Sequence, residues 1–153
     1  TVAMIPELIH HTSLVVMTNS LHVASAMIDL ENEAVLLMTG GTWYMHSDSF
    51  QGQIAEKILR SYDVDKLFTG ADCVNIQRGA TTFNELLSLS RVMAEVAREV
   101  VVMVQSDKIV PKTPNLELPW RSIHTFITDD RLPLEARNKI KARGIKLIFA
   151  AII

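Results

Sequence analysis

The chain has 153 residues, of which 48% are hydrophobic and 21% are charged, and its formal net charge is −2. This length can bury a hydrophobic core without disulfides or a metal, and the composition excludes an intrinsically disordered chain. The lysines and arginines are scattered, which argues against the clustered cationic surface of a nucleic-acid-binding module.

Secretion and membrane insertion are not indicated by the sequence. The longest apolar runs, residues 99–104 and 145–150, are too short to span a bilayer, and no signal peptide opens the chain. The single cysteine, Cys73, cannot form an internal disulfide and suits a reducing compartment. We therefore expect a cytoplasmic protein with no membrane partner.

Short apolar strands alternate with helical periods along the whole chain. In the first half, strands are predicted at 14–17 and 34–38, a helix after its N-cap Ser20, and a second helix after Gly52. In the second half, strands are predicted at 66–69, 100–104, 125–128 and 145–149, with helices at 84–98 and from 134 to Gly144. The segment 106–120 carries three prolines and is expected to form a long loop or an edge element.

The predicted fold class is α/β. Apolar strands without polar alternation are typical of parallel strands covered by helices on both faces. Six such strands alternating with helices predict a three-layer α/β/α domain with a mostly parallel sheet and right-handed crossovers.

Ligands of open parallel sheets bind beyond the carboxyl ends of the strands. The predicted strand ends, at 18–20, 39–42, 70–72, 105–108 and 128–130, are almost all small, hydroxylic, amide or acidic. Gly40 and Gly41 would let backbone N–H groups approach a ligand, and residues 49–52 open a helix whose N-terminus suits phosphate. Lys108 directly follows a central strand and is the natural counter-charge for a phosphate.

Each of these features also has a purely structural interpretation. The glycine pair is consistent with a simple turn, residues 18–20 with a helix cap, and Asp72 with the cap of a turn. Glu85 would complement a helix dipole, and Cys73 would be a small packed residue. The five histidines lack metal-ligand spacing, so neither a metal site nor a cofactor is predicted.

Seven short segments support a resemblance to a known family: residues 18–20, 40–42, 49–52, 65–72, 79–85, 97–100 and 127–130. They resemble, in sequence and in order, the sensor domain of DeoR-family transcriptional repressors, and together they cover essentially the whole chain. The resemblance implies the fold of ribose-5-phosphate isomerase and the CoA-transferases. Residues 81–85 and 90–91 are similar to those of glucitol (sorbitol) operon members of the family.

The resemblance implies one effector-binding and oligomerisation domain over residues 1–153, in homo-oligomers. A winged helix-turn-helix domain would precede it and would alone contact operator DNA. The effector would be a phosphorylated sugar or sugar alcohol, with glucitol 6-phosphate as one candidate. The residues implied to line its pocket are Asn19, Gly40, Gly41, Ser49, Gly52, Asp72, Thr81, Glu85 and Lys108.

The chain departs from the family pattern at several positions. Cys73 stands where glycine is usual, Ser90 where many members have lysine, and Gln105 where Asp is common. Residues 109–111 replace a Phe-Gly-Arg type continuation, and the family's first glycine–hydroxyl loop would precede Thr1. The departures indicate an altered effector and weakened phosphate binding.

Two other functions are consistent with the same residues. In a sugar-phosphate isomerase, Asp72 and Glu85 would act as acid and base, and Lys108 would hold oxyanion charge. The glycine-rich lysine segment of those isomerases is missing, so no enzyme is predicted. A purely structural oligomerisation domain is the third alternative.

Overall fold

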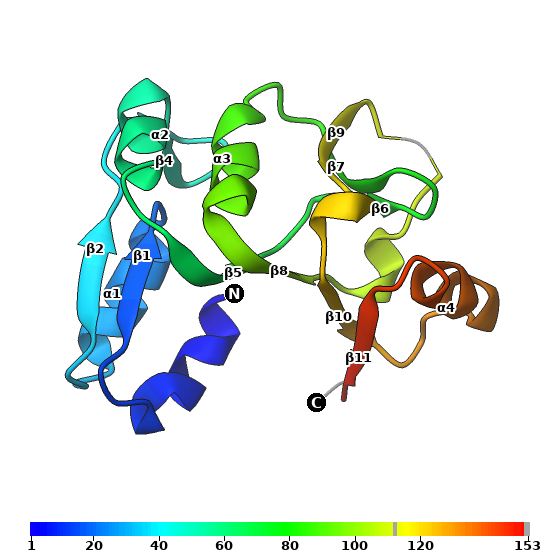
Figure 1. The fold of residues 1–153 in the computed structure, drawn as a ribbon, viewed down its shortest axis with the longest axis horizontal. Coiled ribbons are helices and arrows are strands. Elements are labelled where there is room, and N and C mark those ends of the chain that lie inside the picture. The colour runs from blue at the N-terminus through cyan, green and yellow to red at the C-terminus, as the bar shows by residue number, and fades with distance from the viewer. Residues whose placement is uncertain (112, 152–153) are drawn as a thin grey trace. The chain divides into compact units, whose positions relative to one another are not determined.

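The structure is a computed structural model that describes residues 1–111 and 113–151 (Figure 1). The chain divides into two compact units, Thr1–Tyr62 and Asp63–Ile153. No helix in the described ranges is both long enough and apolar enough to cross a bilayer.

The first unit is built on two parallel strands, β1 (Val15–Thr18) and β2 (Val35–Met38), with Thr18 opposite Met38. Helix α1 (Leu21–Asp29) begins as predicted at Ser20, whose hydroxyl accepts a hydrogen bond from the Val23 N–H at 3.4 Å. The remaining elements of this unit are η1 (Val2–His10), the antiparallel hairpin β3 (Thr42–Tyr44) and β4 (Ser49–Gln51), and α2 (Gln53–Leu59).

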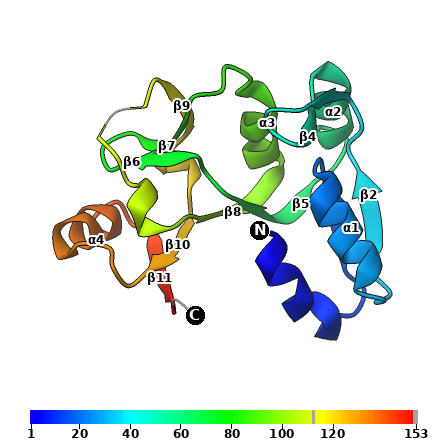
Figure 2. The ribbon, with the colours of Figure 1, turned by 180° about the vertical axis from the view of Figure 1, so that it is seen from behind.

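The second unit contains a four-stranded parallel sheet in the order β11-β10-β8-β5. Helix α3 packs against β8 and β5, and α4 lies beside the edge strand β11 in both ribbon views (Figures 1 and 2). The bounds of these elements are β5 (Val64–Thr69), α3 (Ser88–Val96), β8 (Ala97–Met103), β10 (Thr125–Asp129), α4 (Leu134–Lys141) and β11 (Lys146–Ala150).

A smaller antiparallel sheet, in the order β6-β7-β9, completes the second unit. Its strands are β6 (Cys73–Asn75), β7 (Gly79–Thr82) and β9 (Asn115–Pro119), and two short 3₁₀ turns flank β9, η2 (Ser106–Lys108) and η3 (Trp120–Ser122). A β-bulge interrupts the β7–β9 pairing between Ala80 and Thr81. Bulges often occur next to functional sites because they redirect a side chain.

The core of the second unit joins the two sheets. Phe126 of β10 is fully buried and packs edge-to-face against Trp120, with ring centroids 5.5 Å apart. The Trp120 Nε1 donates hydrogen bonds to the carbonyls of Asn75 (3.1 Å) and Ile76 (2.8 Å), so its polar group is satisfied inside the core. Such contacts fix η3 relative to both sheets.

The predicted α/β class with a mostly parallel central sheet is confirmed. All six predicted strands are present, but four form the central sheet of the second unit while β1 and β2 pair with each other in a separate sheet. The segment 106–120, predicted as a loop or an edge element, contains the edge strand β9. Hydrophobic periodicity predicts where a strand lies in the sequence but not which strand it pairs with.

The predicted helix at 84–98 is too long at both ends. Asn84 instead begins a turn, in which its side-chain oxygen accepts a hydrogen bond from the Leu86 N–H at 2.9 Å, and α3 starts at Ser88. Ala97 and Arg98 belong to β8, because Ala97 pairs with Val64 of β5. Sheet pairing therefore overrides the helical pattern at these two residues.

Candidate functional site

Two of the five residues predicted in the first unit, Asn19 and Ser49, are brought together where β1 ends. The Asn19 side chain donates a hydrogen bond to the Phe50 carbonyl at 3.0 Å, and the Phe50 N–H donates to the Asn19 carbonyl at 2.8 Å. Ser49 forms an isolated antiparallel bridge with Ser20, and its hydroxyl accepts a hydrogen bond from the Gln51 side chain at 3.0 Å. Asn19 and Ser49 thus hold β4 against the end of β1.

The three glycines at this edge differ in their surroundings. Gly41 has a φ of +109°, and a Cβ placed on it would lie 2.5 Å from the Gln51 carbonyl oxygen. Gly40 (φ +65°) has nothing within 4 Å of such a Cβ, and Gly52 (φ +98°) has only the Thr42 hydroxyl at 3.9 Å. The glycine at position 41 is therefore required by the fold, whereas Gly40 leaves its surface open.

In the second unit, Asp72 lies just beyond the end of β5. Its carboxylate accepts a hydrogen bond from the Thr82 hydroxyl, and that hydroxyl in turn accepts from the Asn84 N–H at 3.0 Å. Asp72 is otherwise exposed, so it retains acceptor capacity for a ligand.

Thr81 is the neighbour of Thr82 on β7 and points to the opposite face of that strand. It is fully buried, and its hydroxyl has no hydrogen-bond partner among the residues that the structure describes. Thr81 is therefore a buried polar residue of β7, whereas Asp72 is exposed.

Glu117 is a site residue that the sequence reasoning missed. It lies in β9 at the bulge and accepts a 2.6 Å hydrogen bond from the Ser90 hydroxyl of α3. The pKa of Glu117 is raised, mainly because the carboxyl group is buried. The hydrogen bond from the Ser90 hydroxyl lowers this pKa, and the negative charge of Asp72 raises it further. Two carboxylates and two hydroxyls therefore share one region, which we call the acidic cluster: Asp72, Thr82, Ser90 and Glu117.

Lys108 lies at the end of η2, at the carboxyl end of the central sheet, and its side chain is exposed. The start of this turn is held by Asp129, at the end of β10, which accepts hydrogen bonds from the Ser106 N–H at 2.8 Å and the Ser106 hydroxyl at 2.7 Å. The Arg131 side chain (Nε to Oδ1, 3.0 Å) and these Ser106 donors hold the pKa of Asp129 well below its usual range. Asp129 is thus a buried anion that positions the segment carrying Lys108.

The structure does not bring all of the predicted residues into contact. Asp72 is near Glu117, but within residues 63–111 and 113–151 no hydrogen bond or ion pair joins it to Glu85 or Lys108. Glu85 is exposed, in the turn that precedes α3. Among the described residues no group of three histidine, cysteine or acidic side chains could hold a metal ion.

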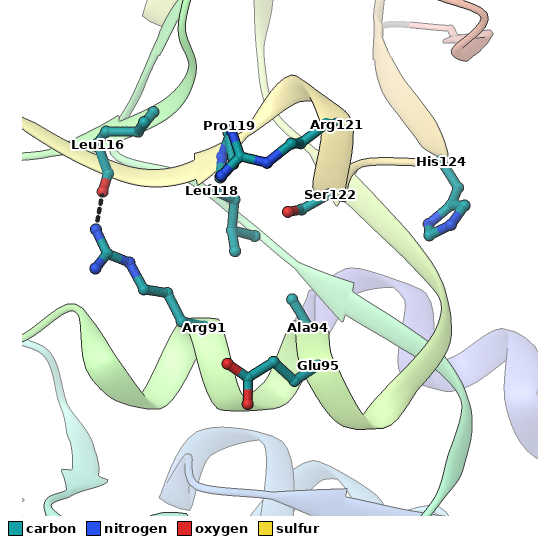
Figure 3. A pocket seen from close by; sticks show the side chains of 9 residues that line it. All are labelled: Arg91, Ala94, Glu95, Leu116, Leu118, Pro119, Arg121, Ser122 and His124. Atoms are coloured by element: carbon teal, nitrogen blue, oxygen red, sulfur yellow. Dashed lines mark hydrogen bonds between the residues drawn. The ribbon is translucent and has the colours of Figure 1, made fainter.

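A pocket of about 440 Å³ lies elsewhere in the second unit, between α3, β9 and η3 (Figure 3). None of the nine predicted site residues lines it. Its lining residues are Arg91, Ala94, Glu95, Leu116, Leu118, Pro119, Arg121, Ser122 and His124.

Comparison with known proteins gives a consistent result. The family model of the DeoR C terminal sensor domain matches residues 1–130. The chain is 34% identical over 139 residues to a proposed aga operon transcriptional repressor of Escherichia coli O157:H7, covering 90% of this chain and 51% of that protein.

Two further relatives are transcriptional regulators by name. The HTH-type regulator YgbI of Escherichia coli K12 is 29% identical over 150 residues, covering 98% of this chain and 58% of that protein. GlpR of Haloferax volcanii is 29% identical over 132 residues, covering 86% of this chain and 51% of that protein. The chain spans between half and three fifths of the length of these relatives.

Proposed function

The chain belongs to the family of DeoR C-terminal sensor domains, and we propose that it is the effector-binding part of a cytoplasmic sugar-operon repressor. The effector would be a phosphorylated sugar or sugar alcohol, and its binding would control operator binding by a helix-turn-helix domain in the same protein. The name of the aga operon relative supports repression as the output, and the names of the other two support transcriptional regulation. Glucitol 6-phosphate stays one candidate among these effectors.

The observation that carries this proposal is the acidic cluster next to the carboxyl end of β5. Carboxylates and hydroxyls are the groups that bind sugar hydroxyls, because together they accept and donate hydrogen bonds. Asp72 has only one of its oxygens bonded to Thr82, and Glu117 only one to Ser90, so each keeps acceptor capacity. A polyol chain would satisfy these remaining acceptors.

Lys108 supplies the positive charge for the phosphate in this proposal. Among the residues that the structure describes it has no ion pair, so its ammonium group is available to an anion. Asp129 would act through the backbone of η2, since it bonds Ser106 rather than the ligand.

Sensing would proceed by a shift in population between two arrangements of the full-length oligomer. The effector must bind one arrangement more tightly than the other, and typical couplings of this kind are on the order of 1–3 kcal/mol. No chemical step is required for that output.

A thermal-shift screen of this chain tests the proposal directly. Phosphorylated hexoses, pentoses and hexitols, including glucitol 6-phosphate, are compared with their unphosphorylated forms. A ligand at about a hundred times its Kd stabilises by roughly 2.7 kcal/mol, which raises Tm by several degrees. The expected result is a selective shift with a phosphorylated compound.

Variants locate the site. Lys108→Ala and Asp72→Asn should each reduce the shift, whereas Lys141→Ala and Asp29→Asn, which change exposed residues of like charge, should leave it intact. A shift that survives both Lys108→Ala and Asp72→Asn would contradict the assignment of the site. Interconversion of the bound phosphosugar by the purified protein would instead favour an isomerase.

A further inference from the structure

The pocket between α3, β9 and η3, called here the α3–η3 pocket, has the size of a small-molecule site. Its volume of about 440 Å³ falls in the range of ordinary ligand pockets, and apolar side chains such as Leu116 and Leu118 form one wall. It shares no residue with the acidic cluster, and neither Lys108 nor Asp129 lines it.

Positively charged and hydrogen-bond-donating groups line this pocket. Arg91 reaches it from α3, and Arg121 reaches it from η3. Figure 3 shows the Arg91 guanidinium beside the Leu116 carbonyl and the Arg121 guanidinium beside Pro119, while Ser122 and His124 lie toward the opposite end of the pocket. Arg91 uses Nη2 to donate to the Leu116 carbonyl at 2.9 Å, which orients the guanidinium and leaves its other N–H groups for a ligand.

The His124 side chain adds a hydrogen-bond donor whose orientation is fixed. Its Nδ1 accepts a hydrogen bond from the Val100 N–H at 3.0 Å, so the neutral ring carries its proton on Nε2. The backbone of His124 is fixed as well, because its N–H donates to the Val100 carbonyl and its carbonyl accepts from the Lys146 N–H, both at 3.0 Å. The imidazole is therefore held in one orientation at the edge of the pocket.

The η3 side of the pocket is fixed by Trp120. This residue is only 4% exposed, its indole nitrogen is hydrogen-bonded to two carbonyls, and the Arg143 guanidinium lies 5.9 Å from its ring centroid. Arg121 and Ser122 directly follow this anchor, so their backbone is positioned before any ligand arrives. A site that is ordered in advance loses less entropy on binding.

Glu95 is the one acidic side chain of the lining and lies on α3, below the arginines in Figure 3. It would repel a bare anion that filled the whole pocket, but it would accept a hydrogen bond from a hydroxyl or ammonium group. A ligand that carries an oxyanion at one end and such a donor at the other matches both halves of the lining.

We propose that the α3–η3 pocket is a second ligand site, which binds a small hydroxylated or amino-bearing organic anion through Arg91, Arg121 and His124. Its oxyanion, a carboxylate or a phosphate, contacts the guanidinium groups, the Nε2–H of His124 donates to a second acceptor of the ligand, and Glu95 accepts from the hydroxyl or ammonium group. The proposal stands apart from the sugar-phosphate site and does not depend on it.

The ring protons of the histidines give a local readout by NMR. The chain has five histidines, and a His124→Gln variant assigns the signals of His124. The protein is titrated separately with inorganic phosphate and with citrate, against sodium chloride at matched ionic strength. Saturable shifts of the His124 signals, with little change at the other four histidines, are expected for at least one of the two anions.

Arg121→Gln is the decisive variant, because the Arg121 side chain has no hydrogen bond or ion pair in the described part of the chain, so folding does not depend on it. It should weaken binding by about tenfold, the effect of one charge-assisted hydrogen bond, while Lys141→Gln leaves binding unchanged. His124 signals that do not move, that move equally in sodium chloride, or that move alike in Arg121→Gln would overturn the proposal. Response to citrate alone or to phosphate alone supports it and identifies the oxyanion.

Discussion

In both units, polar residues follow the carboxyl ends of the parallel strands, but the contacts of these residues differ between the units. In the first unit, the Asn19 side chain is hydrogen-bonded to the Phe50 carbonyl and the Ser49 hydroxyl to the side chains of Ser47 and Gln51, while the Gln51 carbonyl closes in Gly41. In the second unit, Asp72 and Glu117 keep free acceptor oxygens, and the Lys108 side chain is exposed. Similar residue types at similar topological positions thus do structural work in one unit and present unused hydrogen-bonding capacity in the other.

The same sequence motif at a strand end can therefore have either a structural role or a ligand-binding role. A glycine or an asparagine at a strand end can be needed because the chain itself approaches it, with no ligand involved. The substitutions below test that separation, from the largest expected effect to the smallest.

The largest loss of stability is expected for Gly41→Ala. The new Cβ would lie 2.5 Å from the Gln51 oxygen at a φ of +109°, so strain and overpacking together should cost about 3 kcal/mol or more. The matched control is Gly40→Ala, with φ +65° and no atom within 4 Å, which should cost about 1 kcal/mol. Urea unfolding followed by circular dichroism measures both, and equal losses would refute the structural role of Gly41.

A smaller loss is expected for Asp129→Asn, in the second unit. The folded pKa of Asp129 lies below its unfolded value, so its contribution to stability is present above about pH 4, the ordinary pKa of Asp, and is lost as the pH falls further. The variant should therefore be less stable than the wild type at pH 7, and the gap should narrow in strong acid. Unfolding curves at pH 7 and pH 2 check this, and a gap that does not depend on pH would contradict it.

Asn19→Ala should cost about 1 kcal/mol, the usual net contribution of one hydrogen bond. The bond lost is the one from the Asn19 side chain to the Phe50 carbonyl at 3.0 Å. In the thermal-shift screen this variant should still respond to effector if its role is structural. Loss of the ligand response without loss of stability would instead place Asn19 among the ligand contacts.

Glu117→Gln is expected to have the smallest effect and the opposite sign. Burial raises the folded pKa of Glu117 above its unfolded value, so the folded state favours the neutral acid. The stability that this proton binding contributes is fully present below about pH 4.3 and is lost as the pH rises through the folded pKa. The permanently neutral glutamine should thus give a Tm at pH 7 equal to or above that of the wild type, and the two should converge near pH 4. A clear loss of stability at pH 7 would show that the charged carboxylate is needed for folding.

Much of the parallel framework could be predicted because its strands are short apolar runs, although only β8 and β10 contain more than one buried residue. Residues 100–104, for example, contain four valines and lie in or beside the central strand β8. The antiparallel strands β3, β4, β6 and β7 are only three or four residues long, and β3 is exposed throughout, so no periodicity could develop in them. Their pairing is set by contacts between segments that the sequence pattern does not encode.

The site was predictable in the same partial way. Asp72 and Lys108 follow strands that the sequence marks, so the rule for parallel sheets locates them. Glu117 lies in a proline-rich segment without alternation, and only the bulge opposite Ala80 and Thr81 turns it toward Ser90. The sequence does contain an indication of Glu117, an isolated acidic residue between two leucines, but many exposed acidic residues fit the same description.

Helix α3 passes into β8 without a connecting loop, since α3 ends at Val96 and β8 begins at Ala97. No loop at this junction could accommodate one inserted residue. It would either rotate the helix by about 100° or shift β8 by one register position, which turns every side chain of the strand to the other face of the sheet. Homologous chains should therefore vary in length in the turn before Ser88 and keep the helix–strand junction free of insertions and deletions.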